Sequence, residues 1–184
     1  MVRLAYGIDP GVTTTVAISY VDYASLDGNT QAVGTAFYTG GLTGETPFKQ
    51  GQKVRADLSA LIHNIKMNYP DHESIAVIEN YGFANKFTLS QLTTIGTLTR
   101  VCLVENQIPF HEIPPKTLKK FATDNGNASK ADMLAAVRTF YRADCETKDH
   151  NAADALLLAY MGIRFLGGRP LGYLTDKRLA AQFK

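Results

Sequence analysis

The segment Leu4-Ala5-Tyr6-Gly7-Ile8-Asp9-Pro10-Gly11 determines how the rest of the chain is interpreted. Its apolar residues predict a buried strand, and the Asp-Pro-Gly tripeptide ends that strand in a carboxylate followed by a turn. A lone ionised carboxylate beside a core is costly, so Asp9 requires something that compensates its charge.

Two further acids follow apolar runs in the same way. The run 75–78 leads directly to Glu79, and the Ala- and Leu-rich segment 151–159 carries Asp154 within an apolar helix face. Taken singly, Asp9 is equally compatible with an ordinary turn, and Glu79 with a solvated strand end. Three acids attached to core elements suggest that one bound cation compensates the charge of all three. Hard oxygen ligands without a nearby His/Cys pattern suit Mg²⁺ or Mn²⁺, typically two ions about 4 Å apart in phosphoryl transfer.

The composition is that of a globular protein. The chain has 184 residues, of which 45% are hydrophobic and 20% charged, with a formal net charge of +2. This profile excludes a disordered chain and predicts one domain, while the small net charge neither requires nor excludes nucleic acid. The two cysteines fit no metal spacing, and we find no secretory signal and no apolar run of about 20 residues. We therefore expect a soluble protein in a reducing, cytoplasmic setting, with no membrane contact.

The order of predicted elements defines the fold class. Three strands, over 4–9, 12–21 and 32–39, predict an antiparallel meander. A helix over 52–69 and a strand over 74–79 predict a right-handed crossover and a parallel pairing. The remaining predicted elements are a helix over 88–106, a strand over 108–113, a basic helix over 116–121, a helix opening at Ser129, and a last helix from Asp149 or His150 to about Leu166.

This order predicts an α/β fold. The expected mixed five-stranded sheet has three antiparallel strands followed by parallel strands, with helices on both faces. Within the helix over 88–106, Gly96 indicates the close approach of another backbone, from a neighbouring helix or a second subunit. We expect one domain over 1–166 and a basic tail over 167–184.

Several motifs, taken in order, resemble the RuvC family of Holliday-junction resolvases, which have an RNase H-like fold. The segment 7–11 (Gly-Ile-Asp-Pro-Gly) resembles the family's first strand, Ile78-Glu79 its second acid, and 152–156 (Ala-Ala-Asp-Ala-Leu) its closing motif. Between them, 104–109, 114–119 and 126–130 are similar to the family in order and spacing.

The resemblance implies a metal-dependent endonuclease that works as a homodimer on four-way DNA junctions and places paired, symmetric nicks. It also implies basic roles near the scissile phosphate for Lys119 and Lys130, and an aromatic residue near Glu79 that stacks on a base. The family's aromatic lies three residues after the glutamate, where this chain has Gly82, so Tyr81 or Phe83 would take that role.

The fourth metal ligand departs from the family pattern. Bacterial members place Asp, sometimes His, three residues before the last aspartate, where this chain has Asn151. On a regular helix His150 and Asn151 share the face of Asp154, whereas Asp149 reaches inward only from an N-cap position. We expect Asp149 or His150 to assist, and capping alone is equally expected of Asp149. These departures suit a phage-encoded or otherwise divergent member.

Basic residues cluster around the turn before Ser129. They either contact phosphates or form a solvated face. The predicted DNA-binding set consists of Tyr81, Phe83, Lys86, Lys116, Lys119, Lys120 and Lys130.

Three other functions remain open. The segment 9–13 also fits the phosphate-binding turn of ATP-dependent phosphotransferases of the actin and sugar-kinase type, although those proteins need two domains around a cleft. Asn151 favours a catalytically idle junction- or RNA-binding module. The third alternative is a nuclease for branched DNA in general.

Overall fold

The sheet has five strands and mixed pairing. The computed structural model describes residues 2–11, 13–22, 37–40, 44–81, 86–141 and 147–167. The strands are β1 (Val2–Asp9), β2 (Thr14–Asp22), β3 (Phe37–Gly40), β4 (His72–Glu79) and β5 (Phe110–Ile113), in the spatial order β3-β2-β1-β4-β5. Pairings from β1 through β3 are antiparallel, and β4 is parallel to both β1 and β5. The predicted fold class and mixed pairing are confirmed.

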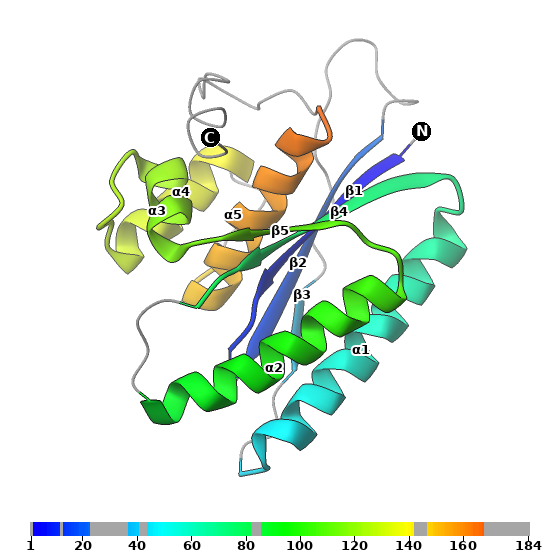
Figure 1. The fold of residues 1–184 in the computed structure, drawn as a ribbon. Helices are drawn as coiled ribbons and strands as arrows, with labels where there is room; N and C mark the ends of the chain where they lie inside the picture. Colours follow the sequence, from blue (N-terminus) through cyan, green and yellow to red (C-terminus); the bar gives the residue numbers. More distant parts are fainter. Residues whose placement is uncertain are drawn as a thin grey trace.

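Helices cover both faces of this sheet (Figure 1). On one face lie α1 (Pro47–Asn68) and α2 (Lys86–Glu105), and on the other lie α3 (Pro115–Thr123), α4 (Lys130–Tyr141) and α5 (His150–Phe165). Alternation along β1 explains the two layers, since Leu4, Tyr6 and Ile8 pack with α1 and α2, whereas Ala5 packs with the end of α5. Among the described residues, no helix combines the length and apolar character needed to cross a bilayer.

A buried tyrosine ties α4 to α5 and to the sheet. The Tyr141 hydroxyl donates to the Leu156 carbonyl at 2.7 Å and lies 2.6 Å from the Ser19 hydroxyl. Because this contact joins three elements through fully buried polar groups, it fixes the position of α5 on β2.

Two sequence-based predictions require correction. The first long helix begins at Pro47 and not at residue 52, because Thr46 serves as N-cap and Pro47 occupies the first turn. The close backbone approach predicted at Gly96 is not made by a neighbouring helix of the described chain, while an approach by a second subunit stays a prediction. A Cβ at Gly96 would meet the hydroxyl of Tyr81, a side chain, at 1.6 Å. The close contact between α1 and α2 involves Gly51 instead, where a Cβ would lie 2.5 Å from Leu98 Cδ1.

Two predicted segments extend beyond the described part of the chain. Residues 32–36 of the third predicted strand lie outside it, and so does the tail from residue 168 onward. The division into a domain over 1–166 and a basic tail stays a prediction.

Candidate active site

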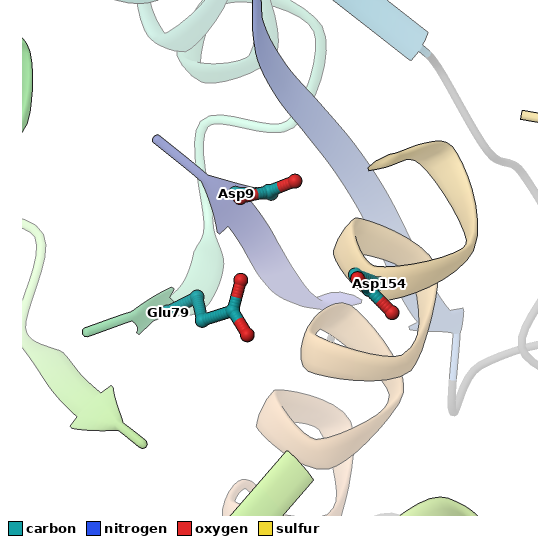
Figure 2. A group of neighbouring side chains, drawn as sticks. All are labelled: Asp9, Glu79 and Asp154. Carbon is teal, nitrogen blue, oxygen red and sulfur yellow. The ribbon is translucent and has the colours of Figure 1, made fainter. Parts of the chain in front are cut away.

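Three carboxylates from distant parts of the chain meet at one end of the sheet (Figure 2). Asp9 is the last residue of β1 and Glu79 the last of β4, and these two strands are parallel neighbours. Asp154 comes from the first turns of α5. One oxygen from each acid lies within 4.8 Å of the others. The predicted convergence of the three acids is therefore found in the structure.

Strand alternation explains why Asp9 and Glu79 share a face. On β4, Ala76 and Ile78 pack with α1 and α2, while Val77 packs with α5. Glu79 therefore points to the α5 side, as Asp9 does two residues after Gly7.

Small residues bring α5 close enough to complete the site. A Cβ at Gly7 would lie 1.9 Å from the carbonyl oxygen of Ala155, and one at Gly162 would lie 2.7 Å from the Ala5 Cβ. Helix and strand therefore touch through backbone atoms at Gly7. This contact, one residue after Asp154 in the sequence, places that acid beside the end of β1.

The three acids lie close together and largely buried, with pKa values above the usual range. Burial, reinforced by the neighbouring acids, raises the pKa of both Asp9 and Glu79 well above the usual range. Burial likewise raises the pKa of Asp154 to about 6. Among the described residues, no lysine or arginine salt bridge includes any of the three. Three clustered carboxylates that form no salt bridge within the described chain are a hard oxygen donor set, which fits Mg²⁺ or Mn²⁺.

Two predicted lysines act electrostatically on this cluster. Lys119 opposes the burial-induced rise in the pKa of Glu79, and Lys119 and Lys130 together oppose the rise at Asp154. The other two predicted lysines, Lys116 and Lys120, are exposed on α3. The basic set therefore divides into Lys119 and Lys130, which act on the acids although Lys130 is itself exposed, and Lys116 and Lys120, which are exposed on α3.

The three candidates for a fourth metal ligand, Asp149, His150 and Asn151, differ in their surroundings. Asp149 is the N-cap of α5, where its Oδ1 accepts from the Asn151 backbone N–H at 3.0 Å. The predicted capping role is confirmed. Burial and the charge of Asp154 raise the pKa of Asp9, and the charge of Asp149 adds to this rise. Neither Asp149 nor His150 joins the close group of ligand atoms found among the described residues.

His150 and Asn151 nevertheless lie near the acids. Burial raises the pKa of Asp154, and the charges of Lys119 and His150 lower it. The Nδ1 atom of His150 is buried and has no hydrogen-bond partner within the described chain. Asn151 is exposed and lines a cavity together with Asp9 and Glu79.

That cavity has a volume of about 340 Å³. Besides Asp9 and Glu79, it is lined by residues that follow β1 and by Tyr81, Leu92 and Pro115. Tyr81 is held in place by Arg100, whose Nη1 donates to the tyrosine hydroxyl at 3.1 Å and whose guanidinium lies 5.2 Å from the ring centroid. Tyr81 therefore forms a fixed wall of the cavity. Phe83 and the side chain of Lys86 lie outside the described part of the chain.

Sequence reasoning missed the group that holds Tyr81. Arg100 also donates to both oxygens of Glu112, at 2.8 and 2.9 Å. The available signal was Gly96, because a residue without a side chain leaves room for the Tyr81 hydroxyl. A sequence pattern alone does not say whether such space is filled by a backbone or by a side chain.

A mixed sheet whose parallel strand ends present two acids to a third on a crossing helix defines the RNase H-like class of proteins with a metal-type carboxylate site. The comparison with protein families is more specific. The model of the family "Crossover junction endodeoxyribonuclease RuvC" matches residues 5–161, and the chain belongs to this family.

Individual relatives agree with this assignment. The chain is 25% identical over 156 residues to the crossover junction endodeoxyribonuclease RuvC of Synechococcus sp., covering 85% of this chain and 95% of that protein. It is 28% identical over 153 residues to the protein of the same description from Salinibacter ruber, covering 83% of this chain and 80% of that protein. The structure of Thermus thermophilus RuvC in complex with a Holliday junction substrate superposes with a TM-score of 0.67 at 17% identity, covering 91% of this chain and 99% of that one, which establishes similarity of fold.

Proposed function

We propose that this protein is a metal-dependent endonuclease that resolves four-way DNA junctions by paired, symmetric nicks. The observation that carries the proposal is the meeting of Asp9, Glu79 and Asp154, whose ligand atoms lie within 4.8 Å of one another. Family membership supplies the substrate class, since the matched family is that of crossover junction endodeoxyribonucleases. A DNA substrate also supports a cytoplasmic location for the proposed activity.

Asp9, Glu79 and Asp154 would hold the metal, and we propose two ions of Mg²⁺ or Mn²⁺ per site. When bound, such ions activate water as a nucleophile and stabilise negative charge on the phosphate. The fourth ligand is proposed from Asp149, His150 and Asn151. His150 has the strongest support, because its buried Nδ1 has no other partner within the described chain.

Basic residues complete the proposed site. Lys119 and Lys130 act on the acids electrostatically, so they are placed to attract a phosphate that lies against the same carboxylates. Lys116 and Lys120, exposed on α3, would contact DNA phosphates farther along the strand. Tyr81, which lines the cavity, would stack on a base, with Phe83 and Lys86 as further proposed DNA contacts.

Paired nicks require two active sites, so a homodimer is part of the proposal. Exposed apolar side chains on α2 support it, since Val101 is 38% and Val104 65% exposed on a helix whose other side is buried. Mass determination in solution should give twice the mass of the chain, and Val104→Glu should shift the protein toward the monomer.

The proposed function is tested by cleavage of a labelled four-way junction beside a matched duplex, in Mg²⁺, Mn²⁺ or chelator. Asp9→Asn, Glu79→Gln and Asp154→Asn should each abolish cutting while junction binding persists. Asp71→Asn is the matched control, because Asp71 is an exposed acid before the opposite end of β4. Normal cutting by any of the three variants would refute the site.

The same assay separates the alternatives. Binding without cutting in either metal would indicate an idle junction- or RNA-binding module. Equal cutting of flaps, forks and four-way junctions would indicate a general branched-DNA nuclease. Mg²⁺-dependent ATP hydrolysis without any nicking would indicate a phosphotransferase. In that case segment 9–13, which contributes Gly11 and Thr13 to the cavity, would bind the nucleotide phosphates.

A further inference from the structure

Thr15 lies directly opposite Asp9 in the antiparallel ladder between β1 and β2. Alternation along β2 fixes the direction of its side chain, because Val16 and Ile18 pack with α1 and α2 while Ala17 packs with α5. Thr15 therefore points to the α5 side, where the three acids lie. Directly opposed residues have Cβ atoms about 4.5 to 5.5 Å apart, which is within reach of one hydrogen bond or one bridging water.

The hydroxyl of Thr15 is buried without a partner. The residue is 0% exposed, and its Oγ1 makes no hydrogen bond within the described part of the chain. The preceding residue behaves differently, since Thr14 is also 0% exposed but donates to the Gly11 carbonyl at 2.9 Å. Burying an unsatisfied hydroxyl is unfavourable, and valine would fill the same volume without that cost. Packing therefore does not account for threonine at this position.

A carboxylate that holds a metal commonly accepts a hydrogen bond from a neighbouring group, which fixes its orientation. In the metal-free protein Asp9 shares a side-chain hydrogen bond with Glu79, which two ionised carboxylates that both bind a metal cannot keep. Thr15, whose hydroxyl has no partner among the described residues, lies opposite Asp9 on the same face. We propose that Thr15 is a positioning residue, whose hydroxyl donates to the Asp9 carboxylate, directly or through one water, when the metal is bound. This inference rests on the proposed metal-dependent function.

If Thr15 positions Asp9, removing the Thr15 hydroxyl should affect protein stability and metal affinity in different ways. In the metal-free protein, Thr15→Val deletes an unsatisfied polar group, so thermal stability should stay the same or rise. In the metal-loaded protein it deletes the group that orients Asp9, so metal affinity should fall. A residue that only packs would produce neither the fall in affinity nor its rescue by a smaller hydroxyl residue.

The test measures Mn²⁺ affinity by the electron paramagnetic resonance signal of free Mn²⁺, together with the melting temperature of the metal-free protein. Thr15→Val should weaken Mn²⁺ binding about tenfold or more, without lowering the melting temperature. Thr15→Ser should bind Mn²⁺ as the unmodified chain does. Thr99→Val is the matched control. Thr99 is a buried threonine on α2 that donates to the Ile95 carbonyl, on the face of the sheet opposite α5, and its variant should keep full Mn²⁺ affinity.

Unchanged Mn²⁺ affinity in Thr15→Val would overturn the inference. So would a loss that Thr15→Ser fails to restore, since side-chain shape would then be the cause. If the valine variant does not fold, the comparison of Thr15→Ala with Thr15→Ser decides the question in the same way. Asp9→Asn separates this inference from the proposed function. If Asp9→Asn binds Mn²⁺ as the unmodified chain does, the metal site itself is wrong, whereas a loss only in Asp9→Asn rejects Thr15 alone.

Discussion

Gly7 of β1 lies against the backbone of Ala155 in α5, so closely that a Cβ at residue 7 would sit 1.9 Å from the Ala155 carbonyl oxygen. Each of these residues is close in sequence to an acid of the site, Gly7 to Asp9 and Ala155 to Asp154. The distance between strand and helix therefore determines the distance between the two carboxylates.

Gly7→Ala should disrupt both the fold and the site. Because the clash is with backbone atoms, α5 must move, and we expect a loss of about 3 kcal/mol or more in the free energy of unfolding. Mn²⁺ affinity should fall as well. Urea unfolding and Mn²⁺ titration provide the two measurements. Gly126→Ala is the control, because its nearest contact would be Lys116 O at 3.3 Å. Equal stability of the two variants would contradict the proposed contact.

The metal-free protein should become less stable as the pH rises. Burial raises the pKa of Asp154 from 3.8 to about 6, so the native state holds that proton more tightly than the unfolded chain does. The resulting stabilisation is present below pH 3.8 and is lost as the pH rises through about 6.

Asp154→Asn should therefore raise the metal-free unfolding free energy at pH 8, on the order of 2 kcal/mol, and change it little at the acid limit. Urea unfolding in chelator at both pH values measures this difference. Asp71→Asn should have no such pH-dependent effect, and a lower stability of Asp154→Asn at pH 8 would contradict the interpretation.

Metal should stabilise the protein in a pH-dependent way. At a free Mn²⁺ concentration 100 times the dissociation constant, the expected stabilisation is about 2.7 kcal/mol. Since binding requires ionised carboxylates, the gain should shrink as the pH falls below about 6, the pKa to which burial raises Asp154. Thermal unfolding with and without Mn²⁺ measures the gain. Asp9→Asn should abolish it, and an equal gain in that variant would place the metal elsewhere.

Two neighbouring lysines should affect different steps. Lys119 opposes the burial-induced rise in the pKa of Glu79, whereas Lys120 is exposed on the same helix. Lys119→Met should lower the cutting rate at saturating junction about tenfold to a hundredfold. Lys120→Met should leave that rate unchanged and reduce the salt slope of binding by about 1. Single-turnover cleavage measures the rate, and binding across a salt series measures the slope. A slower cut in Lys120→Met together with an unchanged rate in Lys119→Met would refute these roles.

Arg100 should stabilise the wall of the cavity through its geometry as well as its charge. Arg100→Lys keeps the charge but loses the two-pronged bond to Glu112, so the unfolding free energy should fall by about 1 to 2 kcal/mol. Arg55→Lys is the control, since Arg55 binds Glu105 in the same manner but is 43% exposed, and it should leave the unfolding free energy nearly unchanged. If urea unfolding gives the same loss of unfolding free energy for both variants, Arg100 contributes no more than an exposed ion pair does.

The three acids were predictable because each follows an apolar run that fixes its place in the core. A carboxylate at the end of a buried strand, as at Asp9 and Glu79, has few positions available to it, and Asp154 has Ala and Leu on both sides. The N-cap role of Asp149 follows from the same kind of local rule.

Contacts between distant side chains were not predictable in this way. Tyr81, which follows β4, contacts Gly96 and Arg100 on α2, and the position of Thr15 depends on the register with which β2 pairs with β1. The start of α1 was missed because glycines and a proline before it suggested a loop, whereas the Pro47 ring suits the first turn of a helix.

The order in which the acids occur along the chain has a consequence for synthesis on the ribosome. Asp9 emerges first, Glu79 follows, and Asp154 arrives only with α5. A nascent chain that stops before His150 therefore carries two acids without the third, and it also lacks the helix that covers this face of β1. Such a fragment lacks the third carboxylate, so the proposed metal site can assemble only after α5 has packed on the sheet.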